Sequence, residues 1–256
     1  MRFATLLCLT ALTALTACGG GQVRPDGAAT EPTAYLDAIS RRADAIKGLT
    51  AEIKLEIWRE QKRVRATQLV AVDGQGRLRI DVLSPFGQPI STLVSDGSRL
   101  MIYSMEERRF LIGAATPENL ARLVPLELSP SALSALLRGA IPVLTHESAE
   151  VAWDKTAGTH QLDLRASGER QLIDFEPAAL RVVRLRQWRG DTVIVDGRFG
   201  DYSGTGDAII PRRMRFESPA ENLQVDLKVV NFRLDPSFTD STFELTPPRG
   251  VPVEAL

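Results

Sequence analysis

Short runs in which apolar and polar residues alternate make up most of the chain after residue 50. The runs that show this period of two are 51–57, 78–82, 162–164, 193–195, 214–216 and 223–229. Turn-forming residues separate them, at 73–74, 96–97, 157–158, 167–168, 189–190 and 204–206. A period of two is typical of a strand with one apolar face. Strands at this spacing predict a large antiparallel meander of about ten or eleven strands.

A helical period precedes the strands. Apolar residues recur at spacings of three and four between residues 33 and 46, with Asp and Arg between them, and Gly48 follows. The apolar positions are Tyr35, Leu36, Ile39, Ala43 and Ile46. This spacing predicts an amphipathic helix, and a glycine after the last turn fits its end. The helix therefore has one face to bury.

Two short helices are expected as an insertion in the meander. Thr116-Pro117 begins one, Ser129-Pro130 begins the other, and Gly139 follows the second. A Ser or Thr cap followed by proline at the first helical position is a strong local start signal. The apolar residues of the two helices are Leu120, Leu123, Val124, Leu133, Leu136 and Leu137.

These elements together predict a mainly β protein of α+β type. Because strand twist accumulates across a sheet, a sheet of this width cannot stay flat. Its apolar face must curl around the helical segments and any ligand that fits between them. We expect a curved antiparallel sheet forming a half-open barrel, covered by the N-terminal helix and by the short inserted helical lid. No internal repeat divides the chain, and residues 33–256 are predicted to form one domain.

The first 17 residues have the features of a signal peptide. Arg2 precedes an apolar run from Phe3 to Ala17, which is too short to span a bilayer stably. The run ends in Leu15-Thr16-Ala17-Cys18, which looks like a lipobox. We therefore predict a lipoprotein signal peptide over 1–17 and a lipid anchor, including palmitate, on Cys18. The alternative is a plain secretory signal with an incidental cysteine.

Residues 18–32 are predicted to be the lipidated cysteine and a flexible tether. The segment is rich in Gly, Pro, Ala and Thr and lacks apolar periodicity. Gly19 fits sorting to the outer membrane, so we expect anchoring at its periplasmic face. Cys8 leaves with the signal, and the mature chain then has a single, acylated cysteine and no disulfide.

Composition narrows the class of partner. The chain is 44% hydrophobic and 25% charged, which is ordinary for a globular protein. Its formal net charge of -1 argues against nucleic acid, because phosphate binding needs clustered Lys and Arg in excess. Nothing in the composition points to an oligomer, and a monomer is expected.

Candidate chemistry is sparse. His146 and His160 lack the spacing of metal ligands and are interpreted as surface histidines. Ser203 lies in G-D-Y-S-G, where the first glycine is one place too far away for a nucleophile elbow. Asp174 and Glu176 are interpreted as a solvated strand face rather than a carboxylate pair. No metal, cofactor or enzymatic activity is predicted.

Arginines occur at strand alternation in three groups, and we expect them to cover the outer face of the sheet, where headgroup attraction is an alternative. The groups are 63 and 65; 184, 186 and 189; and 212, 213 and 215.

The loop Ser84-Pro85-Phe86-Gly87-Gln88-Pro89 joins two predicted strands. Phe86 lies at its tip, where a large apolar side chain gains little from folding. Two interpretations are open. Phe86 folds back onto the sheet edge, or it is an exposed apolar finger that enters a membrane or a hydrophobic ligand.

Three parts of the chain resemble the LolA/LolB superfamily of lipoprotein carriers and outer-membrane lipoprotein receptors. The strand 79–83 running into S-P-F-G is similar to the N-P-L-G turn of the receptor. Residues 130–142, ending in L-L-R-G-A-I-P, resemble its lid helix. Residues 231–236 and 243–250 are similar to the closing F-x-L-x-x-P-x-G of the carriers.

The resemblance implies an eleven-stranded half-open barrel that holds acyl chains of lipoproteins. Pro85, Phe86 and Gly87 would then form a membrane-insertion loop, and a soluble periplasmic carrier would be a partner. The chain departs from the receptor by extra strand material between about 168 and 206. The alternatives are a sensor that reads acyl chains without transfer, or a structural envelope lipoprotein with a packed core.

Overall fold

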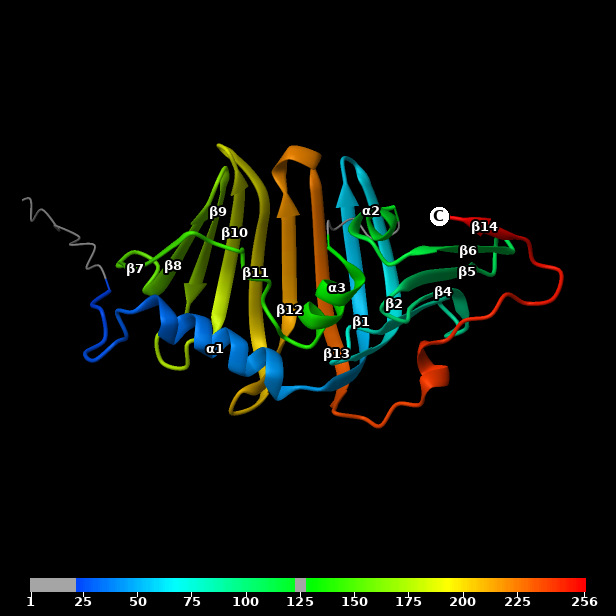
Figure 1. Ribbon diagram of the computed structural model, residues 1–256, viewed down its shortest axis with the longest axis horizontal. Coiled ribbons are helices and arrows are strands. Elements are labelled where there is room, and N and C mark those ends of the chain that lie inside the picture. Colours follow the sequence, from blue (N-terminus) through cyan, green and yellow to red (C-terminus); the bar gives the residue numbers. More distant parts are fainter. Residues whose placement is uncertain (1–21, 123–127) are drawn as a thin grey trace, which may run out of the picture.

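The computed structural model describes residues 22–122 and 128–256. The strands in these residues are β1 (Gly48–Arg59), β2 (Lys62–Asp73), β3 (Leu78–Leu83), β4 (Pro89–Ser95), β5 (Arg99–Ser104), β6 (Arg109–Ala114), β7 (Ser148–Asp154), β8 (Thr159–Ala166), β9 (Glu169–Phe175), β10 (Val182–Arg189), β11 (Thr192–Thr205), β12 (Ala208–Ser218), β13 (Leu223–Leu234) and β14 (Val253–Ala255). They form one curved sheet, in the order β14-β6-β5-β4-β3-β2-β1-β13-β12-β11-β10-β9-β8-β7 (Figure 1).

Neighbouring strands are antiparallel, except that β14 runs parallel to β6. The sheet does not close, because β7 and β14 are its two edges. This confirms the predicted mainly β, half-open architecture, although the sheet has fourteen strands within the described residues rather than about eleven. Strands β9, β10 and β11 occupy the region 168–206, in which extra strand material was expected.

Alternation along the strands determines which face each side chain joins. In β1, Leu49, Ala51 and Ile53 are buried, while the residues between them are more exposed or polar. β1 pairs with β13 through Leu55↔Leu227, and a bulge between Glu52 and Ile53 shifts the register. Such bulges increase local twist, which favours a curled sheet.

Three α-helices of the described chain are α1 (Pro32–Ala45), α2 (Pro117–Ala121) and α3 (Pro130–Leu137), and two 3-10 turns are η1 (Pro219–Glu221) and η2 (Asp240–Phe243). The predicted caps of the insertion are confirmed: Thr116 accepts a hydrogen bond from Asn119 N, and Ser129 accepts one from Ala132 N. α1 and α3 lie across the same face of the sheet (Figure 1). The predicted positions Leu123 and Val124 lie outside the described residues.

The two faces of the sheet carry separate apolar cores. The larger core joins α1 and α3 to the inner face, with Tyr35, Leu136, Leu164 and Phe175 among its buried members. A smaller core lies on the outer face and contains Val94, Met101, Phe110 and Phe243. The C-terminal segment after β13 covers this second core and then adds β14 beside β6 (Figure 1).

The N-terminal segment from residue 22 lies against β7 and the turn that follows it. Gln22 N donates to Lys155 O at 2.7 Å, and the Trp153 indole donates to Gln22 O at 2.9 Å. Tyr35 Oη donates to Ala29 O at 2.8 Å. This part of the predicted tether thus contacts the domain. The predicted signal peptide and Cys18 lie outside the described residues.

None of the helices in residues 22–122 and 128–256 combines the length and apolar character needed to cross a membrane.

Candidate functional site: a cavity beneath the lid helix

A cavity of about 500 Å³ lies on the inner face, between the sheet and the inserted segment that carries α2 and α3. Its volume is within the range of small-molecule binding sites. The apolar part of its lining comes from β10 to β13 and the inserted segment: Ala121, Leu128, Leu136, Pro142, Leu185, Ile194, Val195, Phe199, Phe216, Ala220, Leu223 and Val225. The cavity is therefore a predominantly apolar space under a helical cover.

Buried polar contacts hold α3 in place over the sheet. Ser134 Oγ is fully buried and donates to the carbonyl oxygen of Asp73, the last residue of β2, at 3.0 Å. Arg138 follows the helix and donates through Nη1 to Ile46 O at 2.6 Å, just beyond the end of α1. Burial lowers the pKa of Arg138, a cost that the nearby Asp73 partly offsets. These contacts join the lid to both α1 and the sheet.

A third polar contact fixes the chain that leaves α3. The side chain of Gln171, on β9, is 2% exposed. Its Oε1 accepts from Leu144 N at 2.9 Å, and its Nε2 donates to Pro142 O at 3.1 Å. Because a buried amide needs both partners, this pairing fixes the segment after the lid across the strands.

The cavity is bordered by polar side chains where β1, β10 and β12 end. Antiparallel order places the β1–β2, β10–β11 and β12–β13 turns at the same end of the strands. Arg59 pairs with Glu221 at 3.2 Å, and Arg189 pairs with Glu169 at 3.3 Å. Both arginines line the cavity, so its mouth carries charge while its interior is apolar.

The predicted insertion loop is a tight turn between β3 and β4. Gly87 N donates to Ser84 O at 2.9 Å, and Gln88 N donates to Ser84 Oγ at 3.2 Å. Gly87 has φ +79°, a conformation that favours glycine. Phe86 is 91% exposed, so its side chain does not fold back onto the sheet edge. The turn does not line the cavity, and the structure keeps these two features apart.

His160 and Asp174 are buried, contrary to the prediction that they lie on the surface. His160 is wrong as a surface residue: it is 1% exposed and packs against the rings of Tyr35 and Trp153, at 5.6 and 4.9 Å between centroids. Its alternation with Leu162 and Leu164 was the signal for burial. Burial lowers its pKa, and the positive charge of Arg24 adds to the effect.

Asp174 is also wrong as a solvated residue. It is 6% exposed, accepts from Gln161 Nε2 at 2.9 Å and pairs with Arg186 at 3.3 Å. Burial raises the pKa of Asp174, which Arg186 only partly opposes. No cluster of three His, Cys, Asp or Glu residues able to hold a metal ion occurs in the described part of the chain.

The predicted arginine face is confirmed for most of the pairs that the structure describes. Arg184 pairs with Asp196, and Arg215 pairs with Asp226 at 2.7 Å, both across neighbouring strands. Arg189 and Arg212 are exceptions. Arg189 lines the inner cavity, and Arg212 alternates with the buried core residues Ile210 and Met214. Arg189 follows Arg186 by three residues and Arg212 precedes Arg213 by one, and an odd spacing in a strand reverses the face.

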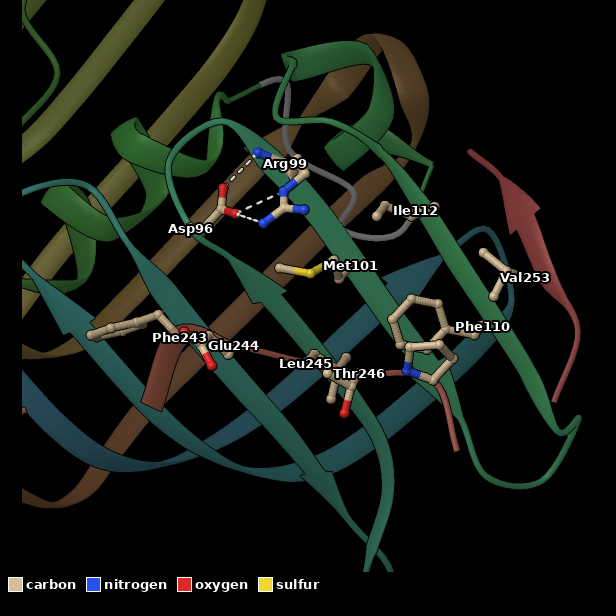
Figure 2. Close-up of a pocket in the computed structure, with 11 residues that line it drawn as sticks. Asp96, Arg99, Met101, Phe110, Ile112, Phe243, Glu244, Leu245, Thr246 and Val253 are labelled. Carbon is tan, nitrogen blue, oxygen red and sulfur yellow. Dashed lines mark hydrogen bonds and ion pairs between the residues drawn. The ribbon is translucent and has the colours of Figure 1, made fainter. Parts of the chain in front are cut away.

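A second cavity, of about 380 Å³, lies between the C-terminal segment and strands β5 and β6 (Figure 2). Apolar side chains such as Met101, Phe110 and Leu245 line it, and Asp96 and Arg99 border one end. Although burial opposes the shift, backbone hydrogen bonds from Arg99 and Ser98 hold the pKa of Asp96 below its ordinary value. The carboxylate is thus engaged by its own turn, which leaves the inner cavity as the better candidate site.

The curved antiparallel sheet, with helices over its inner face and an apolar cavity between them, forms an open half-barrel. It has the LolA-type fold. A putative outer membrane lipoprotein-sorting protein domain from Vibrio parahaemolyticus is similar, with a TM-score of 0.60 and 11% identity over 83% of this chain and 97% of that one. A DUF1329 family protein from Desulfovibrio piger gives 0.59 and 15%, over 84% and 98%.

A LolA superfamily protein from Nitrosomonas europaea is also similar, with a TM-score of 0.56 and 9% identity over 85% of this chain and 99% of that one. The fold expected from the resemblance in the sequence is confirmed. No protein-family model matches the sequence, and no curated protein matches it significantly.

Proposed function

We propose that this protein binds the acyl chains of lipids or lipoproteins in the cavity beneath α3 and has no catalytic role. The observation that carries the proposal is a space of about 500 Å³ with a mainly apolar lining, on a fold similar to that of a lipoprotein-sorting domain. Transfer of an acyl chain from water to such a lining is favourable by about 0.8 kcal/mol for each CH₂.

The proposal includes a location. Acylated Cys18 would hold the protein to the periplasmic face of the outer membrane, as the lipobox indicates. Phe86, almost fully exposed on its turn, would supply a second apolar contact and help insert cargo into the bilayer. A soluble periplasmic carrier would deliver that cargo.

Blocking the cavity tests the proposal. Val195 lines the cavity and is only partly buried, so Val195→Trp projects bulk into existing space rather than into packed core. Val64 is 58% exposed and lies outside the lining, so Val64→Trp is a matched control. Saturable binding of a fluorescent fatty acid, 11-(dansylamino)undecanoic acid, is measured by titration of the purified domain.

We expect the wild type and Val64→Trp to bind the probe alike, and Val195→Trp to bind at least about tenfold more weakly, a loss of about 1.4 kcal/mol. Equal binding by all three proteins would place the probe elsewhere and refute the cavity as the site. Absence of saturable binding to the wild type would favour the structural lipoprotein instead.

A further inference from the structure

Strand β10 presents three different chemistries in order along the cavity wall. Leu185, Gln187 and Arg189 alternate with outward-facing residues, and all three line the cavity. Leu185 is 5% exposed, Gln187 is half-buried, and Arg189 is exposed at the end of the strand. From the interior to the mouth, the wall therefore changes from hydrocarbon to amide to cation over about 13 Å.

The other strands that line the cavity lack this gradient. β11 and β13 contribute apolar side chains, with Val195 beside Gln187 in the register and Leu223 at the start of β13. Arg59 lies on the far side of the mouth, where Glu221 pairs with it at 3.2 Å. The other polar lining residues, Arg59, Gln171, Glu217, Ser218 and Glu221, come from other segments, and β10 alone carries apolar, amide and cationic side chains in order along one strand.

Arg189 can exchange its carboxylate partner, Glu169, for the phosphate of a ligand. Its Nε lies 3.3 Å from Glu169 Oε1, and the side chains are 62% and 30% exposed. An exposed pair of this kind contributes little, whereas a phosphate can accept two hydrogen bonds from one guanidinium. Arg189 lines the cavity, whereas Glu169, its neighbour in the register on β9, is not part of the lining.

The two arginines at the mouth differ in their partners. Glu221 lines the cavity and pairs with Arg59 at 3.2 Å. Glu169, the partner of Arg189, is outside the lining. An anionic group in the mouth is therefore directed toward Arg189 on β10.

We infer that β10 forms a headgroup subsite for an acylated glycerophosphate, resting on the proposed function of the cavity. The hydrocarbon tail lies beside Leu185, the ester carbonyl accepts a hydrogen bond from the Gln187 amide, and the phosphate pairs with Arg189. The order of groups on the strand matches their order in such a lipid. The subsite selects a phosphorylated lipid over a neutral one.

Three probes separate the parts of this inference: 1-palmitoyl-glycerophosphoglycerol, monopalmitoylglycerol, which has the same chain and ester but no phosphate, and inorganic phosphate. Their affinities are measured for the wild type, Arg189→Gln and Arg165→Gln. Arg165 is the matched control, because it is 58% exposed, pairs with Asp163 at 2.8 Å and lies outside the cavity lining. Thermal unfolding checks that each variant folds.

We expect the wild type and Arg165→Gln to prefer the phosphorylated lipid by about tenfold, and Arg189→Gln to lose this preference while binding monopalmitoylglycerol normally. Gln187→Leu should weaken both lipids by a similar factor. A preference that survives Arg189→Gln overturns the inference. Competition by inorganic phosphate as strong as by the lipid also overturns it, in favour of a free anion site.

The proposed function fails in a different way. In that case monopalmitoylglycerol does not bind the wild type at all. Normal binding of the neutral lipid without any phosphate preference leaves the cavity as an acyl-chain site and refutes only the headgroup subsite.

Discussion

Arg138 joins the lid helix to α1, and its replacement by methionine tests whether this contact fixes the lid. The residue is 7% exposed, and its Nη1 donates to Ile46 O at 2.6 Å and to Ala43 O at 3.3 Å. Arg138→Met retains most of the unbranched stem and its packing. It removes the guanidinium and leaves both carbonyls at the end of α1 without this donor.

The magnitude follows from these contacts. A hydrogen bond from a charged donor contributes about 1.5–3 kcal/mol, and the shorter of the two bonds accounts for most of that. The substitution also removes the desolvation cost of burying the guanidinium charge, and this offsets part of the loss. The lowered pKa of Arg138 reflects the same cost. We expect the free energy of unfolding to fall by about 2 kcal/mol, which corresponds to about 4–8 °C in Tm.

Urea unfolding followed by tryptophan fluorescence measures the change, and hydrogen exchange reports on α3 directly. Arg165→Met is the control, because its exposed pair with Asp163 contributes no more than about 1 kcal/mol. The amides of α3 should exchange faster in Arg138→Met only. Wild-type stability together with unchanged exchange in α3 would refute the role of Arg138 in holding the lid.

Two other predictions concern exposed and buried rings. Phe86→Glu should leave Tm unchanged within about 2 °C, because the side chain is exposed. It should reduce both binding to lipid vesicles and insertion of a client lipoprotein, whereas Val64→Glu should reduce neither. Equal vesicle binding and insertion by the two variants would refute the role of Phe86. Because burial holds the pKa of His160 below 6.5, the unfolded chain takes up its proton first, so urea stability should fall as pH drops below about 6.5. His160→Gln should flatten that fall and His146→Gln should not; identical pH profiles would show that another group is responsible.

Local signals in the sequence were sufficient for the helices and most strands. Thr116 and Ser129 cap the two lid helices by accepting hydrogen bonds from amides three residues later, so the start of each helix is determined by local sequence. Alternation predicts β1 equally well, because its buried positions follow a period of two. The exposure of Phe86 follows from a turn whose hydrogen bonds all lie within residues 84–88.

The cavity required information that neighbouring residues do not contain. Its lining combines β1, β9 to β13 and the inserted segment, so volume arises only when distant strands and a helix are brought together. The burial of Asp174 likewise depends on Arg186 and Gln161 from adjacent strands. The odd spacing between Arg186 and Arg189 could have predicted that Arg189 lies on the inner face. The prediction that all three arginines of this strand cover the outer face overlooked that spacing.

If Cys18 carries the proposed lipid anchor, the contacts of Gln22 with β7 and the turn after it limit how the protein can lie on a membrane. Cys18 lies four residues before Gln22, a reach of at most about 14 Å. Phe86 lies in the turn after β3, and β3 is nine strand spacings from β7, or about 43 Å along the sheet. While Gln22 stays bound, Phe86 can meet the same bilayer only when the row of strands lies along its surface. If the row of strands stands perpendicular to the membrane, Phe86 instead faces the aqueous side, where it can contact a molecule in solution.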